Sequence, residues 1–259
     1  MKSWHSLEGK KIWITGGAGY LGAAITAALD AAGARVVCFD LPGRAESLVR
    51  DQRLTSTVAE ALDVNNAATL PAAISTAVEV HGLPDGVALL AYASSSGHRL
   101  ETLPAEDFQK TLDLSLTSAF VLCRELGERM KIRGSGCFVF FSSMYGIVSP
   151  DPRIYQPPLA PNPIDYGASK AALQQMSRYL AVHYGPAGLR FNCITPGAFP
   201  SPSVQKSHPA LVAELVRKTP LARTSTAAEI VGPTLFLLSD GASFVTGHSL
   251  VVDGGWTAW

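Results

Sequence analysis

Short apolar runs alternate with longer segments of helical character along the whole chain. The run Ile12-Trp13-Ile14-Thr15 leads directly into a glycine-rich turn, and Arg35 to Asp40 contains four consecutive apolar residues. Continuous apolar runs of this kind are typical of parallel strands that are buried on both faces. Further strands are predicted at residues 58–62, 87–91, 137–142, 190–195 and 249–252. Helices are predicted between them at about 21–32, 44–53, 66–81, 105–131, 166–184, 205–217 and 226–239.

The alternation of strands and helices predicts βαβ units and a parallel sheet that is covered on both faces. The chain has 259 residues, and no change in composition marks a second domain. We therefore expect residues 1–259 to form one α/β domain of the doubly wound, Rossmann type. Its sheet should have seven parallel strands, with the functional site at their carboxyl ends.

The segment 147–165 cannot be a regular helix or a central strand, because proline lacks a backbone donor and fixes φ. Between Ser149 and Tyr166 it contains six prolines, namely Pro150, Pro152, Pro157, Pro158, Pro161 and Pro163. We expect a stiff loop here, which is either a substrate wall carrying Arg153, Tyr155 and Gln156 or a subunit-contact loop. A second substrate-side region, containing a helix and Phe199, is predicted at about 198–220.

Composition excludes several classes of function. Lys and Arg together number 21, as do Asp and Glu, so the formal net charge is zero and no electrostatic footprint for nucleic acid or an anionic membrane is expected. The four cysteines form no C-x-x-C and the six histidines show no metal-ligand spacing, so buried free thiols and no metal site are predicted. No apolar run has the length of a signal core or a membrane span, which predicts a soluble cytoplasmic protein.

The glycine-rich turn Thr15-Gly16-Gly17-Ala18-Gly19-Tyr20-Leu21-Gly22 lies between a predicted strand and its helix. Glycine permits a tight turn and close backbone approach, and the helix N-terminus supplies N–H groups for a pyrophosphate. Asp40 ends the next strand, where a carboxylate binds the ribose hydroxyls of NAD and repels the 2′-phosphate of NADP. NAD(H) is therefore favoured over NADP(H), although Arg44 is placed to reach a phosphate. Asp63 either contacts the adenine or caps the 66–81 helix.

Tyr166 and Lys170 are one helical turn apart, with Ser143 upstream of them. A phenol has an ordinary pKa of about 10, and a neighbouring ammonium favours its phenolate form. The pair therefore suits proton transfer.

These motifs, taken in order and with their spacing, resemble a short-chain dehydrogenase/reductase over essentially the whole chain. Three further features carry the resemblance, namely Asp63-Val64, Pro196-Gly197 and the ending Val251 to Gly255. Ser143-Met144-Tyr145-Gly146, the loop around Arg153-Ile154-Tyr155 and the tail from Asp253 to Trp259 are also similar to a bacterial subgroup. Its members are often associated with nonulosonic-acid, flagellin-glycan and other surface-sugar pathways.

The resemblance implies a mechanism. Ser143 would hold the substrate oxygen, with Ser142 as the competing candidate, and Tyr166 would exchange the proton with that oxygen. Lys170 would lower the tyrosine pKa and bind the nicotinamide ribose, while hydride passes between substrate carbon and nicotinamide. The other positions predicted to contact cofactor are Gly16, Gly19, Tyr20, Leu21, Gly22, Asp40, Leu41, Asp63, Val64, Ala91, Pro196 and Gly197. Homodimers or homotetramers that pair the 105–131 and 166–184 helices are also implied.

The chain departs from the family pattern in three places. Its glycines at 16, 19 and 22 have the spacing of the family's longer, nucleotide-sugar-modifying branch. Leu89-Leu90-Ala91-Tyr92 stands where Asn-Asn-Ala-Gly is usual, so a polar brace must come from elsewhere, with residues 94–96 as candidates. Ser115 replaces the asparagine that usually holds a proton-relay water, and it is the candidate for that fourth catalytic position.

Three functional hypotheses follow. The leading one is an NAD-dependent dehydrogenase or ketone reductase for a small polar, sugar-like substrate. The glycine spacing supports a second, an epimerase or dehydratase acting on a sugar nucleotide with transient hydride transfer. The altered motifs support a third, a nucleotide-binding protein without turnover.

Overall fold

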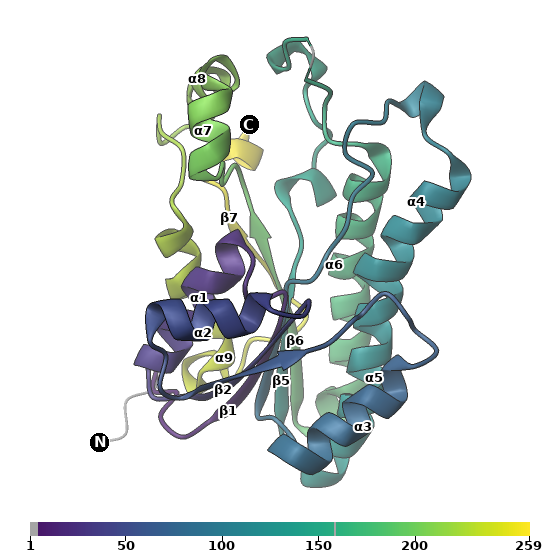
Figure 1. Cartoon of the computed structure of the whole chain (residues 1–259), viewed down its shortest axis with the longest axis vertical. Helices are drawn as coiled ribbons and strands as arrows, with labels where there is room; N and C mark the ends of the chain where they lie inside the picture. The colour runs from purple at the N-terminus through teal and green to yellow at the C-terminus, as the bar shows by residue number, and fades with distance from the viewer. Residues whose placement is uncertain (1–4, 158) are drawn as a thin grey trace.

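The described residues form one seven-stranded parallel sheet with the strand order β3-β2-β1-β4-β5-β6-β7, which confirms the predicted fold class (Figure 1). The computed structural model describes residues 5–157 and 159–259, so Pro158 of the proline-rich segment lies outside the described residues. Strand order reverses between β1 and β4, which creates the crevice where open α/β sheets bind ligands. The strands are β1 Lys11–Thr15, β2 Arg35–Asp40, β3 Thr57–Ala61, β4 Gly86–Leu89, β5 Gly136–Phe141, β6 Leu189–Pro196 and β7 Ser249–Val252.

Helices cover both faces of the sheet, with α1 and α9 on one side and α3, α5 and α6 on the other (Figure 1). Alternate side chains of β1 enter the two cores: Trp13 packs with the α3, α5 and α6 side, and Ile12 and Ile14 pack with the α1 and α9 side. The helices are α1 Tyr20–Ala31, α2 Arg44–Gln52, α3 Leu70–His81, α4 Ala105–Leu112, α5 Ser118–Arg133, α6 Ile164–Tyr184, α7 Pro202–Ser207, α8 Pro209–Lys218 and α9 Val231–Leu238.

Three helix predictions need correction. The helix predicted at 66–81 begins at Leu70, because the preceding residues form turns. The helix predicted at 105–131 is interrupted by a π-helical turn, Asp113–Thr117. The helix predicted at 205–217 is two helices, because Pro209 lacks an N–H and instead opens α8.

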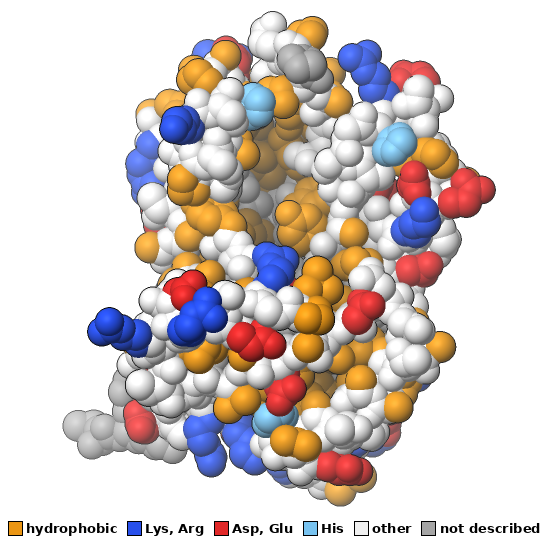
Figure 2. All heavy atoms as spheres, viewed as in Figure 1, with side chains coloured by type: hydrophobic (Ala, Val, Ile, Leu, Met, Phe, Trp, Pro, Cys, Tyr) orange, Lys and Arg blue, Asp and Glu red, His pale blue; other side chains and the backbone are white. Residues whose placement is uncertain are grey.

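The carboxyl ends of the strands carry the segments that enclose the site. Helices α7 and α8, the C-terminal tail and the proline-rich loop all stand at this end of the molecule (Figure 1). Figure 2 shows a hollow between them, with hydrophobic side chains along its walls. Within the described ranges, no helix combines the length and apolar character needed to cross a membrane.

Candidate active site

Two adjoining cavities, of about 230 and 440 Å³, lie at the carboxyl ends of the strands. Both are lined by Gly16, Gly19, Tyr20, Leu90 and Tyr92, so they form one continuous cleft. The smaller is lined by Ser143, Tyr166 and Lys170, and the larger by Asp40 at the end of β2 and Asp63 after β3. An elongated dinucleotide would extend through both cavities.

The glycine-rich turn has the geometry of an anion cradle. Gly16 has φ +69°, and a Cβ there would lie 2.8 Å from the backbone nitrogen of Ala91. A Cβ on Gly22 would collide with the carbonyl oxygen of Gly16, so neither glycine can be replaced without moving backbone. Gly19 precedes α1 and no side chain caps the helix, which leaves the N–H groups of its first turn for a ligand. These residues fit a cofactor pyrophosphate.

Asp40 is buried at the end of β2 and faces the larger cavity. One carboxylate oxygen accepts a hydrogen bond of 2.9 Å from the Ala18 N–H, and the other accepts one of 2.9 Å from the Leu41 N–H. Arg44 lies 3.3 Å from the same carboxylate. The predicted ribose reader and the residue predicted to compete with it are therefore an ion pair on one wall of the cleft.

The other residues predicted to contact the adenosine half lie in the same cavity. Leu41, Asp63, Val64 and Ala91 all line it. Asp63 accepts hydrogen bonds from both nitrogens of Asn65, at 2.9 and 2.6 Å, and forms a local turn. The alternative role of Asp63 as a helix cap is wrong, because α3 begins seven residues later.

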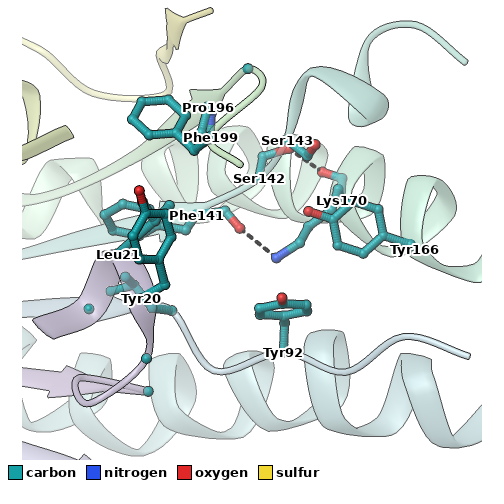
Figure 3. Close-up of a pocket in the computed structure, with 15 residues that line it drawn as sticks. Tyr20, Leu21, Tyr92, Phe141, Ser142, Ser143, Tyr166, Lys170, Pro196 and Phe199 are labelled. Carbon is teal, nitrogen blue, oxygen red and sulfur yellow. Dashed lines mark hydrogen bonds between the residues drawn. The ribbon is translucent and has the colours of Figure 1, made fainter. Parts of the chain in front are cut away.

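Ser143, Tyr166 and Lys170 converge on the smaller cavity (Figure 3). The Ser143 hydroxyl accepts a 3.1 Å hydrogen bond from the Tyr145 N–H and is hydrogen-bonded to Tyr166. Ser142 also faces the cavity, but its hydroxyl donates to the Lys170 carbonyl at 2.7 Å and accepts from Gln174 at 2.9 Å. These bonds attach Ser142 to α6, which favours Ser143 as the residue that holds a substrate oxygen.

Burial dominates the electrostatics of the pair on α6. It raises the pKa of Tyr166 to about 12, against a smaller lowering effect of the Ser143 hydrogen bond. It lowers the pKa of Lys170 to about 8, because the ammonium is removed from water. The Lys170 Nζ donates a 2.8 Å hydrogen bond to the carbonyl of Phe141 at the end of β5.

Tyr92 completes this group, and the sequence analysis assigned it no role. Its ring centroid lies 4.9 Å from the Lys170 Nζ and 5.9 Å from the Tyr166 ring, which it meets edge to face. Figure 3 shows the Tyr92 ring beside the ammonium. The sequence feature that could have identified Tyr92 is its place at the fourth position of Leu89-Leu90-Ala91-Tyr92, where glycine is usual in the family.

A buried carboxylate at the start of α6 was also missed. Asp165 accepts hydrogen bonds from the N–H and the hydroxyl of Ser95, at 3.0 and 2.8 Å. This is the polar brace expected from residues 94–96, and it attaches the loop after β4 to the residue before Tyr166. Ser115 instead accepts from the Ala93 N–H at 3.1 Å and donates to the Ala93 carbonyl at 3.4 Å. Ser115 is not among the residues that line the two cavities, so its relay role stays a prediction.

The substrate side contains Pro196, Gly197 and Phe199, which line the smaller cavity. The structure does not bring Arg153 there, since its side chain is 85% exposed and paired with Asp151. Tyr155 lines a separate cavity beside the proline-rich loop, and its hydroxyl lies 2.8 Å from that of Tyr145. Contacts of Arg153 and Tyr155 with substrate therefore stay predictions.

Asp151 also pairs with Lys218 of α8, and this ammonium lies over the Trp256 ring, 5.5 Å from its centroid. The proline-rich loop, α8 and the C-terminal tail are thus joined. All four cysteines are free and buried, as predicted. Among the residues that the structure describes, no cluster of three or more His, Cys, Asp or Glu side chains is suited to a metal ion.

Comparison with known proteins identifies related sequences over almost the full length. A family model described as Enoyl-(Acyl carrier protein) reductase matches residues 17–257. D-threitol dehydrogenase of Mycolicibacterium smegmatis is 31% identical over 97% of this chain and 94% of its own. Galactitol 2-dehydrogenase (L-tagatose-forming) of Cereibacter sphaeroides is 30% identical, covering 98% and 97%. A crystal structure of a short chain dehydrogenase from Leptospira borgpetersenii with bound NAD+ has a TM-score of 0.88 and 27% identity, covering 99% and 96%.

Proposed function

Because the chain belongs to the short-chain dehydrogenase/reductase family, we propose that it is an NAD(H)-dependent oxidoreductase for a small, uncharged polyol or the corresponding ketose. The observation that carries this proposal is the convergence of Ser143, Tyr166 and Lys170 on the cavity that adjoins the glycine-rich turn. The family relationship supports a nicotinamide cofactor, and the cradle at the start of α1 fits its pyrophosphate.

The mechanism proposed for these residues follows from their contacts. When bound, the nicotinamide supplies the acceptor or donor of hydride. Ser143 holds the substrate oxygen by a hydrogen bond, and Tyr166 removes the hydroxyl proton in oxidation or returns it in reduction. The Lys170 ammonium, 5.6 Å from the Tyr166 ring centroid, stabilises the phenolate and binds the nicotinamide ribose.

The preference for NAD rests on Asp40. Its carboxylate retains lone pairs beyond the two backbone hydrogen bonds and would accept from ribose hydroxyls. A 2′-phosphate at the same wall would be repelled by Asp40, and the Arg44 guanidinium is already paired with that carboxylate.

The preference for an uncharged substrate rests on the charges near the site. Among the described residues that line the smaller cavity, Lys170 is the one charged side chain. Lys218 and Arg153, two cations of the surrounding segments, share the carboxylate of Asp151 as an ion-pair partner, which reduces their combined charge. The two related dehydrogenases are named for polyols, threitol and galactitol. The narrower resemblance to surface-sugar enzymes stays a prediction.

Assembly into a homodimer or homotetramer is also proposed. Phe120 on α5 and Tyr179 and Val182 on α6 are exposed, and these are the helices predicted to pair. Apolar side chains on a helix face favour burial against a second copy.

The experiment that tests the function starts with parallel fluorescence titrations with NADH and NADPH, followed by NAD reduction with threitol, galactitol and glycerol. The proposal expects tighter NADH binding and net NADH formation. Tyr166→Phe should abolish turnover and retain NADH binding. Modification of a sugar nucleotide without net NADH formation would favour the epimerase or dehydratase hypothesis, and NADH binding without any turnover would favour the non-catalytic one.

A further inference from the structure

Lys170 carries a buried positive charge with few polar partners. Its side chain is 3% exposed, and its ammonium has three N–H groups. One donates to the Phe141 carbonyl, and the described part of the chain provides no second acceptor. A buried charge without full compensation is costly, so any further attraction for the ammonium favours its charged form.

Two aromatic rings supply that attraction. The Nζ of Lys170 lies 4.9 Å from the Tyr92 ring centroid and 5.6 Å from that of Tyr166. Both distances are within the range of a cation–π interaction, in which the negative face of the ring attracts the cation. Tyr166 belongs to the same helix as Lys170, whereas Tyr92 reaches it from the loop after β4, on the other side of the cleft (Figure 3).

The Tyr92 side chain is otherwise weakly held. It is 57% exposed, and its ring contacts in the structure are with Lys170 and Tyr166. A large, half-exposed ring on the wall of both cavities is not needed to fill the core. Its position is explained by the group that it covers.

We propose that Tyr92 is a positioning residue for the catalytic pair, whose ring holds the Lys170 ammonium in its charged form and at the angle required for the cofactor ribose and for Tyr166. The ring of Tyr92 acts on Lys170 from the same loop whose polar brace is the Ser95–Asp165 contact. This inference rests on the proposed function only in the role given to Lys170.

The titratable and charged groups around Lys170 are few. Tyr166 faces it from α6 and Tyr92 from the loop after β4, while Cys193 faces it from β6. Burial lowers the pKa of Lys170 to about 8. Burial also raises the pKa of Cys193 to about 12, so this thiol stays neutral over the range in which Lys170 titrates. A change at Tyr92 should therefore be visible as a change in the titration of Lys170.

The test measures NADH affinity by fluorescence between pH 6.5 and 10, without any substrate. Wild type should lose affinity as Lys170 loses its proton, and Lys170→Met should show no such midpoint. Tyr92→Leu retains an apolar cover but removes the ring face, so the midpoint should move about half a pH unit or more to lower pH. Tyr92→Phe retains the face and should restore the wild-type midpoint.

Equal midpoints in wild type and Tyr92→Leu would overturn the proposal. A wild-type affinity that does not change over this range would also overturn it, because the charge on Lys170 would then not govern cofactor binding. Failure of the proposed function is seen separately, as absence of alcohol oxidation in the presence of normal NADH binding. Because Tyr92 is more than half exposed, the substitutions should not prevent folding, and thermal unfolding of each variant checks this.

Discussion

Replacing Asp165 should both destabilise the fold and loosen the loop that carries Tyr92. The carboxylate is fully buried at the first turn of α6, and it accepts from the N–H and hydroxyl of Ser95. Thr111 provides a further hydrogen bond. Asp165→Ala would leave the buried hydroxyl of Thr111 and the two half-buried donors of Ser95 without this acceptor.

The magnitude follows from the number of orphaned donors. Each buried donor left without a partner costs roughly 1–3 kcal/mol, and the lower part of this range applies to the two half-buried donors of Ser95, so the three together predict a loss of about 3–5 kcal/mol of unfolding free energy. For a chain of this size, 1 kcal/mol corresponds to a Tm shift of about 2–4 °C, and a decrease of about 6–20 °C is expected. Ser95→Ala removes one donor and should cost less. The double variant should lose less than the sum of the single variants, because Ser95 and Asp165 share these bonds.

The assay is urea unfolding of the four proteins in this cycle, with Asp51→Ala as a matched carboxylate control. Asp51 is exposed and pairs with its neighbour Arg50, so its removal should change stability by less than about 0.5 kcal/mol. An Asp165→Ala variant as stable as the control, or losses that simply add in the cycle, would refute the reasoning.

The buried carboxylate of Asp165 also predicts that stability depends on pH. Burial favours a higher pKa for Asp165, but the hydrogen bonds from Thr111 and Ser95 outweigh it and lower the pKa below its ordinary value. A carboxylate whose pKa is lower in the folded state stabilises the protein above its unfolded pKa of about 3.9, and this contribution is lost as pH falls through the folded pKa. Asp165→Asn should therefore be less stable than wild type at pH 7, and the difference should diminish in acid.

Three further predictions concern the cleft and its rim. Asp40→Ala should remove the ribose reader and expose Arg44, so the preference for NADH over NADPH should fall at least about tenfold in parallel fluorescence titrations. Asp151→Asn should remove the carboxylate that pairs with Lys218. The value of kcat/KM for a carboxylate substrate such as gluconate should then rise several-fold at low salt, and this gain should disappear at high salt. Oxidation of the uncharged substrate galactitol should change little. Because the pKa of Lys170 is lowered to about 8 in the folded state, the unfolded chain binds more protons than the folded one between pH 8 and about 10.4. As pH rises through this range, cofactor-free wild type should therefore gain stability relative to Lys170→Met. Urea unfolding of both proteins measures this difference.

Local patterns in the sequence were sufficient to predict the sheet. Apolar positions identified the strands of the sheet; β1, β2, β4, β5 and β6 are mostly buried, whereas the edge strands β3 and β7 are partly exposed. The π-helical turn at residues 113–117 could not be predicted in this way. Ser115 there bonds to Ala93, and Ser118 donates to Leu114, so the irregular turn is accompanied by a contact with a distant loop.

In the site, too, features that depend on local sequence could be predicted, and features that depend on contacts between distant residues could not. The spacing of Tyr166 and Lys170 on one helix is local, and both line the predicted cleft. Asp165 and Ser95 are 70 residues apart, and Asp151 and Lys218 are 67 apart. No sequence spacing indicates such pairs. The charge of Arg153 suggested a contact with substrate, but its guanidinium pairs with Asp151, two residues earlier in the chain.

Two departures from the family pattern concern polar side chains, and both involve the loop that follows β4. The first is the loss of the asparagine pair before this loop, and the second is Ser115, which bonds to Ala93 in it. The asparagine pair is replaced by Leu89 and Leu90, which are buried in the two opposite cores of the sheet. The polar contacts are provided further along the loop, where Ala93 bonds to Ser115 and Ser95 bonds to Asp165. Between these contacts, Tyr92 faces the catalytic lysine. A loop that had merely lost its asparagines would leave buried polar groups unpaired, whereas this one pairs them and places an aromatic ring on the ammonium. This compensation supports the hypothesis of an active enzyme over that of a protein that binds nucleotide without turnover.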